Sequence, residues 1–295
     1  MVIAGPTAVG KSEVAFKLAK RHNGEIINAD SVQIYQEVSI GTSKPPNDWF
    51  KEVPHHLFNF ISINKEFTVF DYKTLARNVI KDIKERGKLP VIVGGTGLYI
   101  RGLLHGIFEQ PKADKKLREE LQAEENETPG ILHIKLKEID PDSANKIHPN
   151  DLVRIIRAIE VWELTGTKIS DLQKEHKFND SPYNYKGVFL IKPENILKDN
   201  IKKRTKKIIE DGIIDEVKTI LNNNFSRDLK PLKTVGYKET IEYIDGKINS
   251  IEKLEEKINQ STWRLARRQK IWFKKEKGFT ILENKTNIIE EIMNI

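Results

Sequence analysis

One eight-residue segment near the start of the chain constrains its fold more than any other feature. Residues 5–12 read Gly-Pro-Thr-Ala-Val-Gly-Lys-Ser, which matches the phosphate-binding pattern G-x-x-x-x-G-K-[ST] in full. The apolar run 1–4 precedes it, and residues 11–22 follow with apolar side chains at helical spacing. In such a strand–loop–helix unit, backbone N–H groups and the helix N-terminus bind phosphate oxygens. The segment therefore predicts a binding site for a di- or triphosphate.

Two side chains at the end of this loop indicate how the phosphates would be held. Lys11 can supply positive charge to the terminal phosphates, and the Ser12 hydroxyl can bind Mg²⁺. A glycine-rich turn without a ligand is the alternative, and the complete match in its context argues against it. Many nucleotide kinases and NTPases share this nucleotide-binding loop, so the motif leaves the reaction open.

Strand-like and helix-like stretches alternate over the first 105 residues, and the part after residue 186 is mostly helical, with a strand signal at 187–191 and a short one at 279–282. This alternation, with short glycine turns, predicts an α/β fold: a P-loop NTPase-like parallel sheet covered by helices. Strands are expected at 1–4, 25–29, 56–63, 90–93, 187–191 and 279–282, and helices at 11–22, 69–86, 98–104, 194–211, 213–221, 236–244 and 251–275.

The pattern changes after Pro111. A charged helical stretch at 114–127 and an amphipathic one at 151–165 follow, and no strand signal appears until residue 187. We therefore predict an all-helical insertion domain at 112–178 and a catalytic core formed by 1–111 and 179–295.

Composition excludes several classes of protein. The 50 Lys and Arg against 43 Asp and Glu give a net charge of +7, which permits an anionic partner but also fits a solvated lysine-rich surface. The chain has no cysteine, which excludes disulfides, thiol catalysis and thiolate zinc sites. No apolar run approaches the roughly 20 residues of a membrane span, and no signal-peptide pattern is present. We expect a cytoplasmic protein that does not enter membranes.

Two polar segments follow predicted strands. Asp30 comes directly after strand 25–29, and Gly94-Gly95-Thr96-Gly97 ends strand 90–93. Ligands of open α/β sheets bind at the carboxyl ends of the strands, so we expect Asp30 near the phosphate loop. Asp30 is a candidate Mg²⁺ ligand or general base, or else a turn residue, and Thr96 is a candidate site residue or a helix cap. The absence of an acid after strand 90–93 favours group transfer over nucleotide hydrolysis.

Further blocks make a family resemblance specific. The phosphate loop and these blocks, in this order, resemble tRNA dimethylallyltransferases of the bacterial type (tRNA isopentenyltransferases, the IPP transferase family) over essentially the whole chain. The cysteine-free sequence also lacks the zinc finger of many eukaryotic members. The blocks are NADSVQIY (28–35), IGTSKP (40–45), PHHL (54–57), VGGTGLY (93–99), HPND (148–151) followed by Arg154 and Arg157, TVGYKE (234–239) and RRQKIWF (267–273).

The resemblance implies a reaction and its partners. A dimethylallyl group would pass from dimethylallyl diphosphate to N6 of the adenosine immediately 3′ of the anticodon, in tRNAs that read codons beginning with U. Diphosphate would leave with the assistance of Mg²⁺, and the loop would hold this diphosphate rather than ATP. The adenosine must leave the anticodon-loop stack, which implies base flipping. The expected partners are tRNA and dimethylallyl diphosphate, and the expected state is a monomer.

The resemblance also implies roles for individual residues. Asp30 would be the general base and Thr96 would line the channel where base and prenyl donor meet, so both are candidate catalytic residues. The candidate metal ligand is Ser12. The candidate diphosphate-binding residues are Gly5, Thr7, Ala8, Val9, Gly10, Lys11, Ser12 and Arg204. The candidate tRNA-binding residues are Asp30, Ser31, Val32, Gln33, Thr96, Arg118, Arg154, Arg157, Arg264, Arg267 and Arg268.

Basic residues interleave with aromatic ones at 263–275. These arginines can share a face that contacts RNA phosphates, or the segment can be a surface helix whose Trp and Phe pack inward. Lys202, Lys203, Lys206 and Lys207 fit a solvated face better, and the adjacent His55 and His56 make a poor metal chelate.

Three other functions remain open. They are an adenylate isopentenyltransferase, a small-metabolite kinase and a non-catalytic tRNA-binding module. The helical insertion and the basic helix argue against a free-nucleotide substrate, and Asp30 beside a complete phosphate loop argues against a module without catalysis.

Overall fold

The structure, a computed structural model, describes residues 1–176, 180 and 182–294. The chain divides into two compact units, each described by itself below. The sheet unit combines Met1–Leu103 with Tyr183–Ile295, and the helical unit is Leu104–Pro182.

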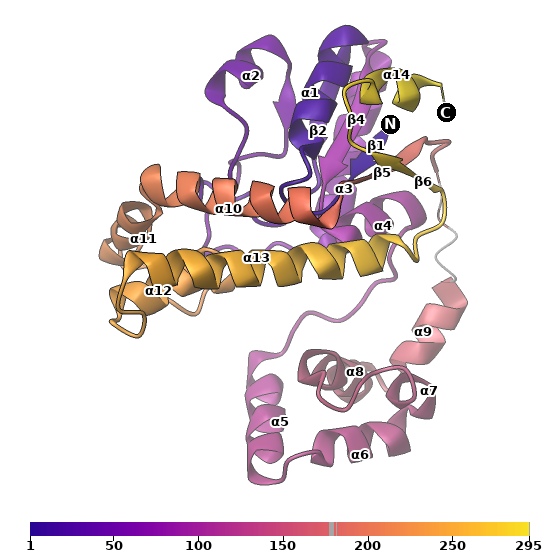
Figure 1. Ribbon diagram of the computed structural model, residues 1–295. Helices are drawn as coiled ribbons and strands as arrows, with labels where there is room; N and C mark the ends of the chain where they lie inside the picture. Colours follow the sequence, from indigo (N-terminus) through magenta and orange to yellow (C-terminus); the bar gives the residue numbers. More distant parts are fainter. Residues whose placement is uncertain (177–179, 181, 295) are drawn as a thin grey trace. The chain divides into compact units, whose positions relative to one another are not determined.

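A six-stranded parallel sheet forms the centre of the sheet unit (Figure 1). Its strand order is β3-β2-β4-β1-β5-β6, and every adjacent pair is parallel. The parallel sheet predicted from the alternating pattern is thus confirmed. The strands are β1 (Val2–Ala4), β2 (Gly24–Asn28), β3 (His55–His56), β4 (Leu89–Gly94), β5 (Gly187–Ile191) and β6 (Phe279–Glu283).

The register brings the carboxyl ends of three central strands to one edge. Ala4 of β1 lies opposite Gly94 of β4, and Asn28 of β2 lies opposite Val93. The phosphate loop, Asp30 and the glycine turn after β4 therefore start from neighbouring points, as the rule for open α/β sheets requires.

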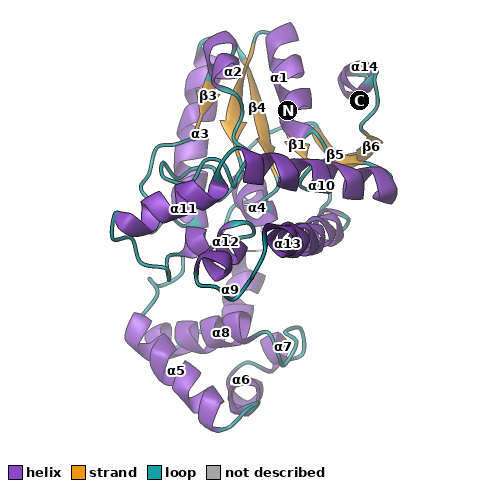
Figure 2. Cartoon of the chain, turned by 60° about the vertical axis from the view of Figure 1, so that its left-hand side comes forward, coloured by secondary structure: helices purple, strands orange, loops and turns teal. Residues whose placement is uncertain are grey.

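Helices cover both faces of this sheet (Figure 2). α1 and α3 both contact β2 and β4, from opposite faces, and α13 packs against α10 and α12. The helices of this unit are α1 (Lys11–Arg21), α2 (Asn47–Glu52), α3 (Val69–Glu85), α4 (Gly97–His105, which continues into the helical unit), α10 (Glu194–Glu210), α11 (Ile213–Asn222), α12 (Tyr237–Ile244), α13 (Ile251–Phe273) and α14 (Ile288–Met293), with a 3-10 turn η1 (Lys230–Lys233).

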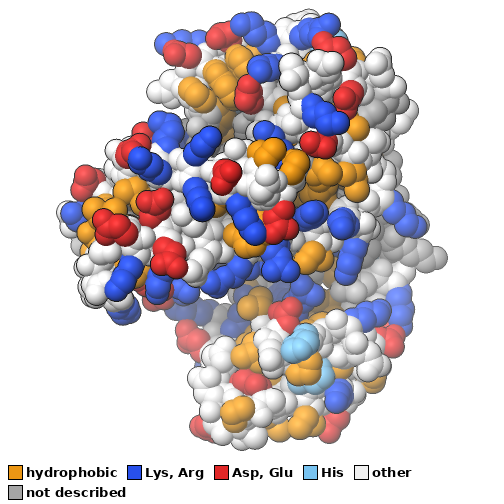
Figure 3. Space-filling model, viewed as in Figure 1, with side chains coloured by type: hydrophobic (Ala, Val, Ile, Leu, Met, Phe, Trp, Pro, Cys, Tyr) orange, Lys and Arg blue, Asp and Glu red, His pale blue; other side chains and the backbone are white. Residues whose placement is uncertain are grey.

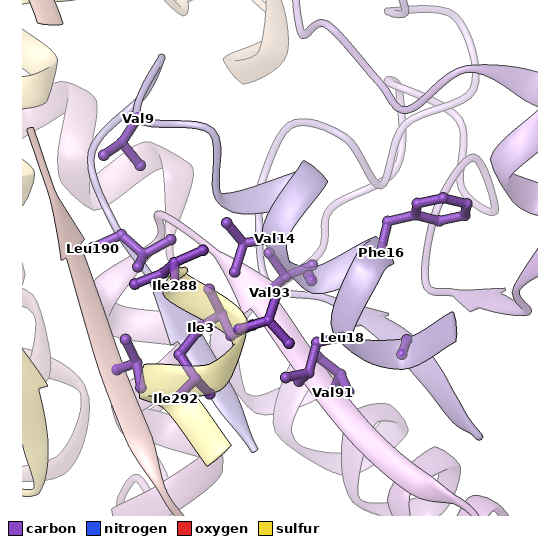
Figure 4. Close-up of a cluster of buried hydrophobic side chains, with 14 of the residues drawn as sticks. Ile3, Val9, Val14, Phe16, Leu18, Val91, Val93, Leu190, Ile288 and Ile292 are labelled. Carbon is purple, nitrogen blue, oxygen red and sulfur yellow. The ribbon is translucent and has the colours of Figure 1, made fainter. Parts of the chain in front are cut away.

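A buried apolar cluster fixes α1 on the sheet (Figure 4). Ile3 and Val93 share one face of the sheet in register, and Val14 and Leu18 of α1 pack onto them. Ile292 of α14 closes the same cluster. Each such side chain contributes about 1.5–3 kcal/mol on burial, so this packing anchors the helix that begins at the phosphate loop.

The prediction of a strand over 56–63 is wrong except at its first residue. The structure forms only the two-residue β3 and an isolated parallel bridge between Tyr35 and Ile61. Leu57 and Asn59 have φ values of 63° and 50°, and backbone in the left-handed region cannot continue an extended strand.

The helical unit contains five further helices and, among its described residues, no strand. Leu132 and Leu136 of α6 pack against Ile155 and Ile159 of α8 in its core. The helices are α5 (Lys115–Glu127), α6 (Ile131–Ile139), α7 (Pro141–Ala144), α8 (Leu152–Thr165) and α9 (Ile169–His176). None of the helices in the described part of the chain is long and apolar enough to cross a membrane.

Candidate functional site

A cavity of about 330 Å³ opens at the carboxyl edge of the sheet. The phosphate loop forms one side of it, and Asp30 and Arg204 lie on its wall. The structure therefore brings Asp30 to the phosphate loop, as its place after β2 predicted. Among the predicted site residues, those that line the cavity are Thr7, Ala8, Gly10, Lys11, Ser12, Asp30, Val32, Gln33 and Arg204.

Gly5 and Val9 support the loop rather than line the cavity. A Cβ at Gly5 would lie 2.8 Å from a Val9 methyl carbon and 3.2 Å from the Leu190 carbonyl oxygen. Val9 is fully buried in the cluster beneath α1. Gly10 has a φ of 92°, a left-handed conformation that glycine adopts readily, and α1 begins at the next residue.

Two cationic side chains make the cavity suited to an anion. Burial lowers the pKa of Lys11 to about 8, with the nearby Asp30 acting in the opposite direction and Arg204 adding to the decrease. Burial also lowers the pKa of Arg204, which Asp30 counteracts. Both cations are thus removed from water without enough nearby negative charge to balance theirs. A bound diphosphate would supply that negative charge.

Asp30 is held in a tight turn by its own carboxylate. Its Oδ1 accepts hydrogen bonds from the backbone N–H groups of Val32 (2.9 Å) and Gln33 (3.3 Å), and its N–H donates to Asn28 Oδ1 at 2.9 Å. The turn role foreseen as an alternative is therefore real, and it orients the carboxylate at the wall of the cavity.

Thr96 ties together the segments that follow β2 and β4. Its Oγ1 accepts from the Ser31 N–H at 3.0 Å and donates to Ser31 Oγ at 3.2 Å, while its own N–H donates to the Ala29 carbonyl at 3.2 Å. Ser31 thus follows Asp30 in the chain and Thr96 is hydrogen-bonded to Ser31, but neither residue lines the cavity itself.

A hydrogen-bond network behind Arg204 had no role in the sequence prediction. Arg204 donates to the Gly41 carbonyl at 3.4 Å, and the Gly41 N–H donates to the Tyr237 hydroxyl at 3.1 Å. Tyr237 in turn donates to Glu216 at 2.6 Å, and Glu216 also accepts from the N–H groups of the loop before Gly41. The sequence contains these residues in the blocks 40–45 and 234–239, but only the fold shows that the two blocks are in contact.

The helical unit holds three of the predicted tRNA-binding arginines. Arg118 and Arg157 both donate to Glu160, whose side chain is fully buried. Arg154 is largely exposed and pairs with Asp151 at 3.1 Å, one turn away. Arg118 and Arg157 are therefore structural partners inside this unit as well as candidates for RNA contact.

α13 presents basic side chains outward and aromatic ones inward. Phe273 is buried, Trp263 packs against the core cluster, and Arg101 lies 4.4 Å from the Trp272 ring centroid. The inward packing considered as an alternative is therefore correct for the aromatics. Lys and Arg side chains gather over α10 and α13 (Figure 3). The exposed Lys and Arg residues of α10 and α13 are Lys198, Lys202, Lys203, Lys206, Lys207, Lys253, Lys257, Arg264, Arg267, Arg268 and Lys270, and the exposed Lys274 and Lys275 follow α13 directly.

The residues available to a metal ion are few. Among the described residues there is no group of three or more His, Asp and Glu side chains that could hold an ion. Ser12 and Asp30 both line the cavity. Mg²⁺ binds through one or two protein groups together with substrate phosphates and water, so this donor set fits an ion that arrives with a diphosphate.

Comparisons with known proteins all lead to the same family. The family model described as IPP transferase matches residues 33–276. The tRNA dimethylallyltransferase of Thermotoga neapolitana is 44% identical over 93% of this chain and 88% of that protein. The Petrotoga mobilis protein of the same name is 42% identical over 100% of this chain and 96% of that protein.

Solved structures share the fold. The full-length tRNA isopentenylpyrophosphate transferase of Bacillus halodurans superposes with a TM-score of 0.73 at 37% identity, covering 99% of this chain and 93% of that one. A eukaryotic dimethylallyltransferase captured acting on tRNA gives a TM-score of 0.76 at 32% identity, covering 96% of this chain and 73% of that one.

Proposed function

The chain belongs to the IPP transferase family, and from this premise we propose that it transfers a dimethylallyl group from dimethylallyl diphosphate to tRNA. The acceptor is N6 of the adenosine immediately 3′ of the anticodon, in tRNAs that read codons beginning with U. The observation that carries the proposal is a single cavity in which the phosphate loop, Lys11 and Arg204 lie with Asp30.

The cavity supplies the groups that this substitution needs. The adenine N6 atom forms a bond to the allylic carbon while the bond from that carbon to the diphosphate oxygen breaks. The diphosphate gains negative charge as it leaves, and Lys11 and Arg204 stabilise that charge. Asp30 accepts the proton that N6 gives up. Both reactants are held by one edge of the sheet, which supplies proximity and orientation.

Mg²⁺ fits the diphosphate side of the cavity. The Ser12 hydroxyl at the start of α1 would hold the ion together with diphosphate oxygens, and the ion would neutralise leaving-group charge when bound. Thr7, Ala8 and Gly10 would contact the diphosphate from the loop, with Gly5 and Val9 shaping that loop.

The tRNA is proposed to contact both units. In the sheet unit, Ser31, Val32, Gln33 and Thr96 would contact the flipped adenosine or its neighbours, and the exposed arginines of α13 would contact RNA phosphates. In the helical unit, proposed as a tRNA-binding insertion over 112–178, Arg118, Arg154 and Arg157 would extend the contact. A cytoplasmic monomer fits this function.

Transfer of label from the donor tests the proposal. The purified protein is incubated with labelled dimethylallyl diphosphate, Mg²⁺ and either tRNA or AMP. We expect label in tRNA and none in AMP. Label in AMP would instead support an adenylate isopentenyltransferase, and phosphate transfer from ATP without prenylation would support a kinase; either result contradicts the proposal.

A further inference from the structure

Three side-chain amides from the C-terminal part of the chain brace the phosphate loop. Gln269 Oε1 of α13 accepts from the Thr7 N–H at 2.9 Å, Asn200 of α10 donates to the Ala8 carbonyl at 3.1 Å, and Asn284 donates to the Val9 carbonyl at 2.6 Å. Ala8 has a φ of 63°, which is unfavourable for a residue with a Cβ. These hydrogen bonds therefore help to hold a loop conformation that the backbone alone does not favour.

Gln269 differs from the other two because its amide has a second partner. Its Nε2 donates to the Gly95 carbonyl at 3.1 Å, in the glycine turn that follows β4. One side chain thus bridges the loop proposed to hold the diphosphate and the turn that carries Thr96. Thr96 in turn hydrogen-bonds to Ser31, the residue after Asp30.

Two glycines of this turn leave room for side chains of α13. A Cβ at Gly95 would lie 2.3 Å from Gln269 Nε2, and a Cβ at Gly97 would lie 2.2 Å from Trp272 Nε1. Gln269 and Trp272 are three residues apart and face the same way along α13. The block GGTG and the block RRQKIWF are therefore two halves of one contact, which sequence alone does not reveal.

We propose that Gln269 is a positioning residue that sets the spacing between the diphosphate loop and the two segments that carry Asp30 and Thr96. The inference rests on the proposed prenyl transfer, because spacing matters only if donor and acceptor react across this gap. Gln269 lies between Arg268 and Lys270, whose exposed side chains share its helix. The residue would thus fix the reacting groups relative to the helix proposed to bind tRNA.

A near-isosteric substitution separates this role from simple packing. Gln269→Met keeps the length of the side chain and removes both hydrogen bonds. We expect kcat to fall by roughly 100-fold, as for small misplacements of reacting groups, while the Kd for tRNA stays within about twofold. Thr219→Val is the matched control: it removes a hydrogen bond from an exposed side chain of α11, outside the cavity, and should leave kcat unchanged.

Gly95→Ala approaches the same contact from the other side. Its methyl group would displace the far end of Gln269, so we expect a loss of kcat similar to that of Gln269→Met. Gln269→Ala leaves space for that methyl group. The kcat of the double variant Gln269→Ala/Gly95→Ala should therefore be no lower than that of the slower of its two single variants, Gln269→Ala and Gly95→Ala.

Three results would overturn the positioning role. The first is a loss of kcat in the double variant that equals the product of the losses in Gln269→Ala and Gly95→Ala. The second is an unchanged kcat in Gln269→Met. The third is a loss of kcat in Gln269→Met that disappears when the assay is run well below the Tm of the variant. If the unaltered protein transfers no label to tRNA, the proposed function fails instead.

Discussion

At the scale of single residues, Asp30 combines two tasks. Its Oδ1 caps the turn that leads into Val32 and Gln33, and the carboxylate also lies on the wall of the cavity. Replacement by alanine would remove both contributions. The substitution Asp30→Asn separates them, because it keeps an oxygen acceptor for the turn and removes the base.

We therefore expect Asp30→Asn to lower kcat by roughly 10²–10⁴-fold, the usual contribution of a general base. The Kd for tRNA, measured by filter binding or anisotropy, should change by less than about threefold. A loss of tRNA binding that matches the loss of rate would show that Asp30 acts through the turn alone.

The lowered pKa of Lys11 leads us to expect that donor binding depends on pH. Burial lowers the pKa of Lys11 to about 8 in the free protein, and a bound diphosphate favours the protonated form. Affinity for dimethylallyl diphosphate should therefore be constant below pH 8 and fall as pH rises above it, by at most about tenfold per pH unit. Calorimetric titration between pH 6.5 and 9.5 measures this, and Lys11→Met should bind more weakly without that step. An unchanged step in Lys11→Met would contradict the assignment.

At the scale of elements, α13 has two functional faces. Its inner face supplies Gln269 to the phosphate loop and Phe273 to the core, and its outer face exposes Arg267 and Arg268. The tRNA contacts proposed for the outer face are largely electrostatic, so they should depend on salt.

The double substitution Arg267→Gln/Arg268→Gln should weaken tRNA binding by roughly tenfold, ~1.4 kcal/mol. The slope of log Kd against log salt concentration should fall by about one for each phosphate that the variant no longer binds. Lys206→Gln/Lys207→Gln, on α10, removes the same two positive charges from lysines that pair with Glu210 (3.8 Å) and Asp211 (3.1 Å), and it should change Kd by less than about twofold. Equal effects of the two changes would show that only net charge matters.

Sequence patterns predicted the elements that carry strong periodicity or a motif. The phosphate loop, the strands of the sheet other than β3, and α3, α8, α10 and α13 follow from apolar spacing and glycine stops. The missed α2 and α14 are six-residue helices, too short to show a period, and α6, α7 and α9 of the helical unit, four to nine residues long, were not predicted individually either. The hydrogen bonds of Gln269 to Thr7 and Gly95 span more than 170 residues of sequence, so local patterns carry no information about them.

At the scale of the whole molecule, the two units have separate sources of stability. The helical unit buries Glu160 completely between Arg118 and Arg157. Burial raises the pKa of Glu160, but hydrogen bonds from the two arginines outweigh that effect and lower it below its usual value. This stabilisation is present above the unfolded pKa of the carboxyl group and is lost as pH falls through the lower folded value.

Glu160→Gln should therefore destabilise the helical unit by about 3 kcal/mol, because two guanidinium groups lose their buried partner. Hydrogen exchange should accelerate in α5, α6 and α8 and stay unchanged in β1 and β4, and binding of inorganic diphosphate should persist. Uniform acceleration across both units would show that they unfold as one.

Prenylation of a single adenosine of tRNA by this chain can be measured with a matched pair of tRNAs. One transcript carries adenosine immediately 3′ of an anticodon that reads a codon beginning with U, and the other differs only by guanosine at that position. With labelled dimethylallyl diphosphate, we expect label on N6 of that adenosine in the first tRNA and none in the second. Equal labelling of the two tRNAs, or none in either, would contradict it.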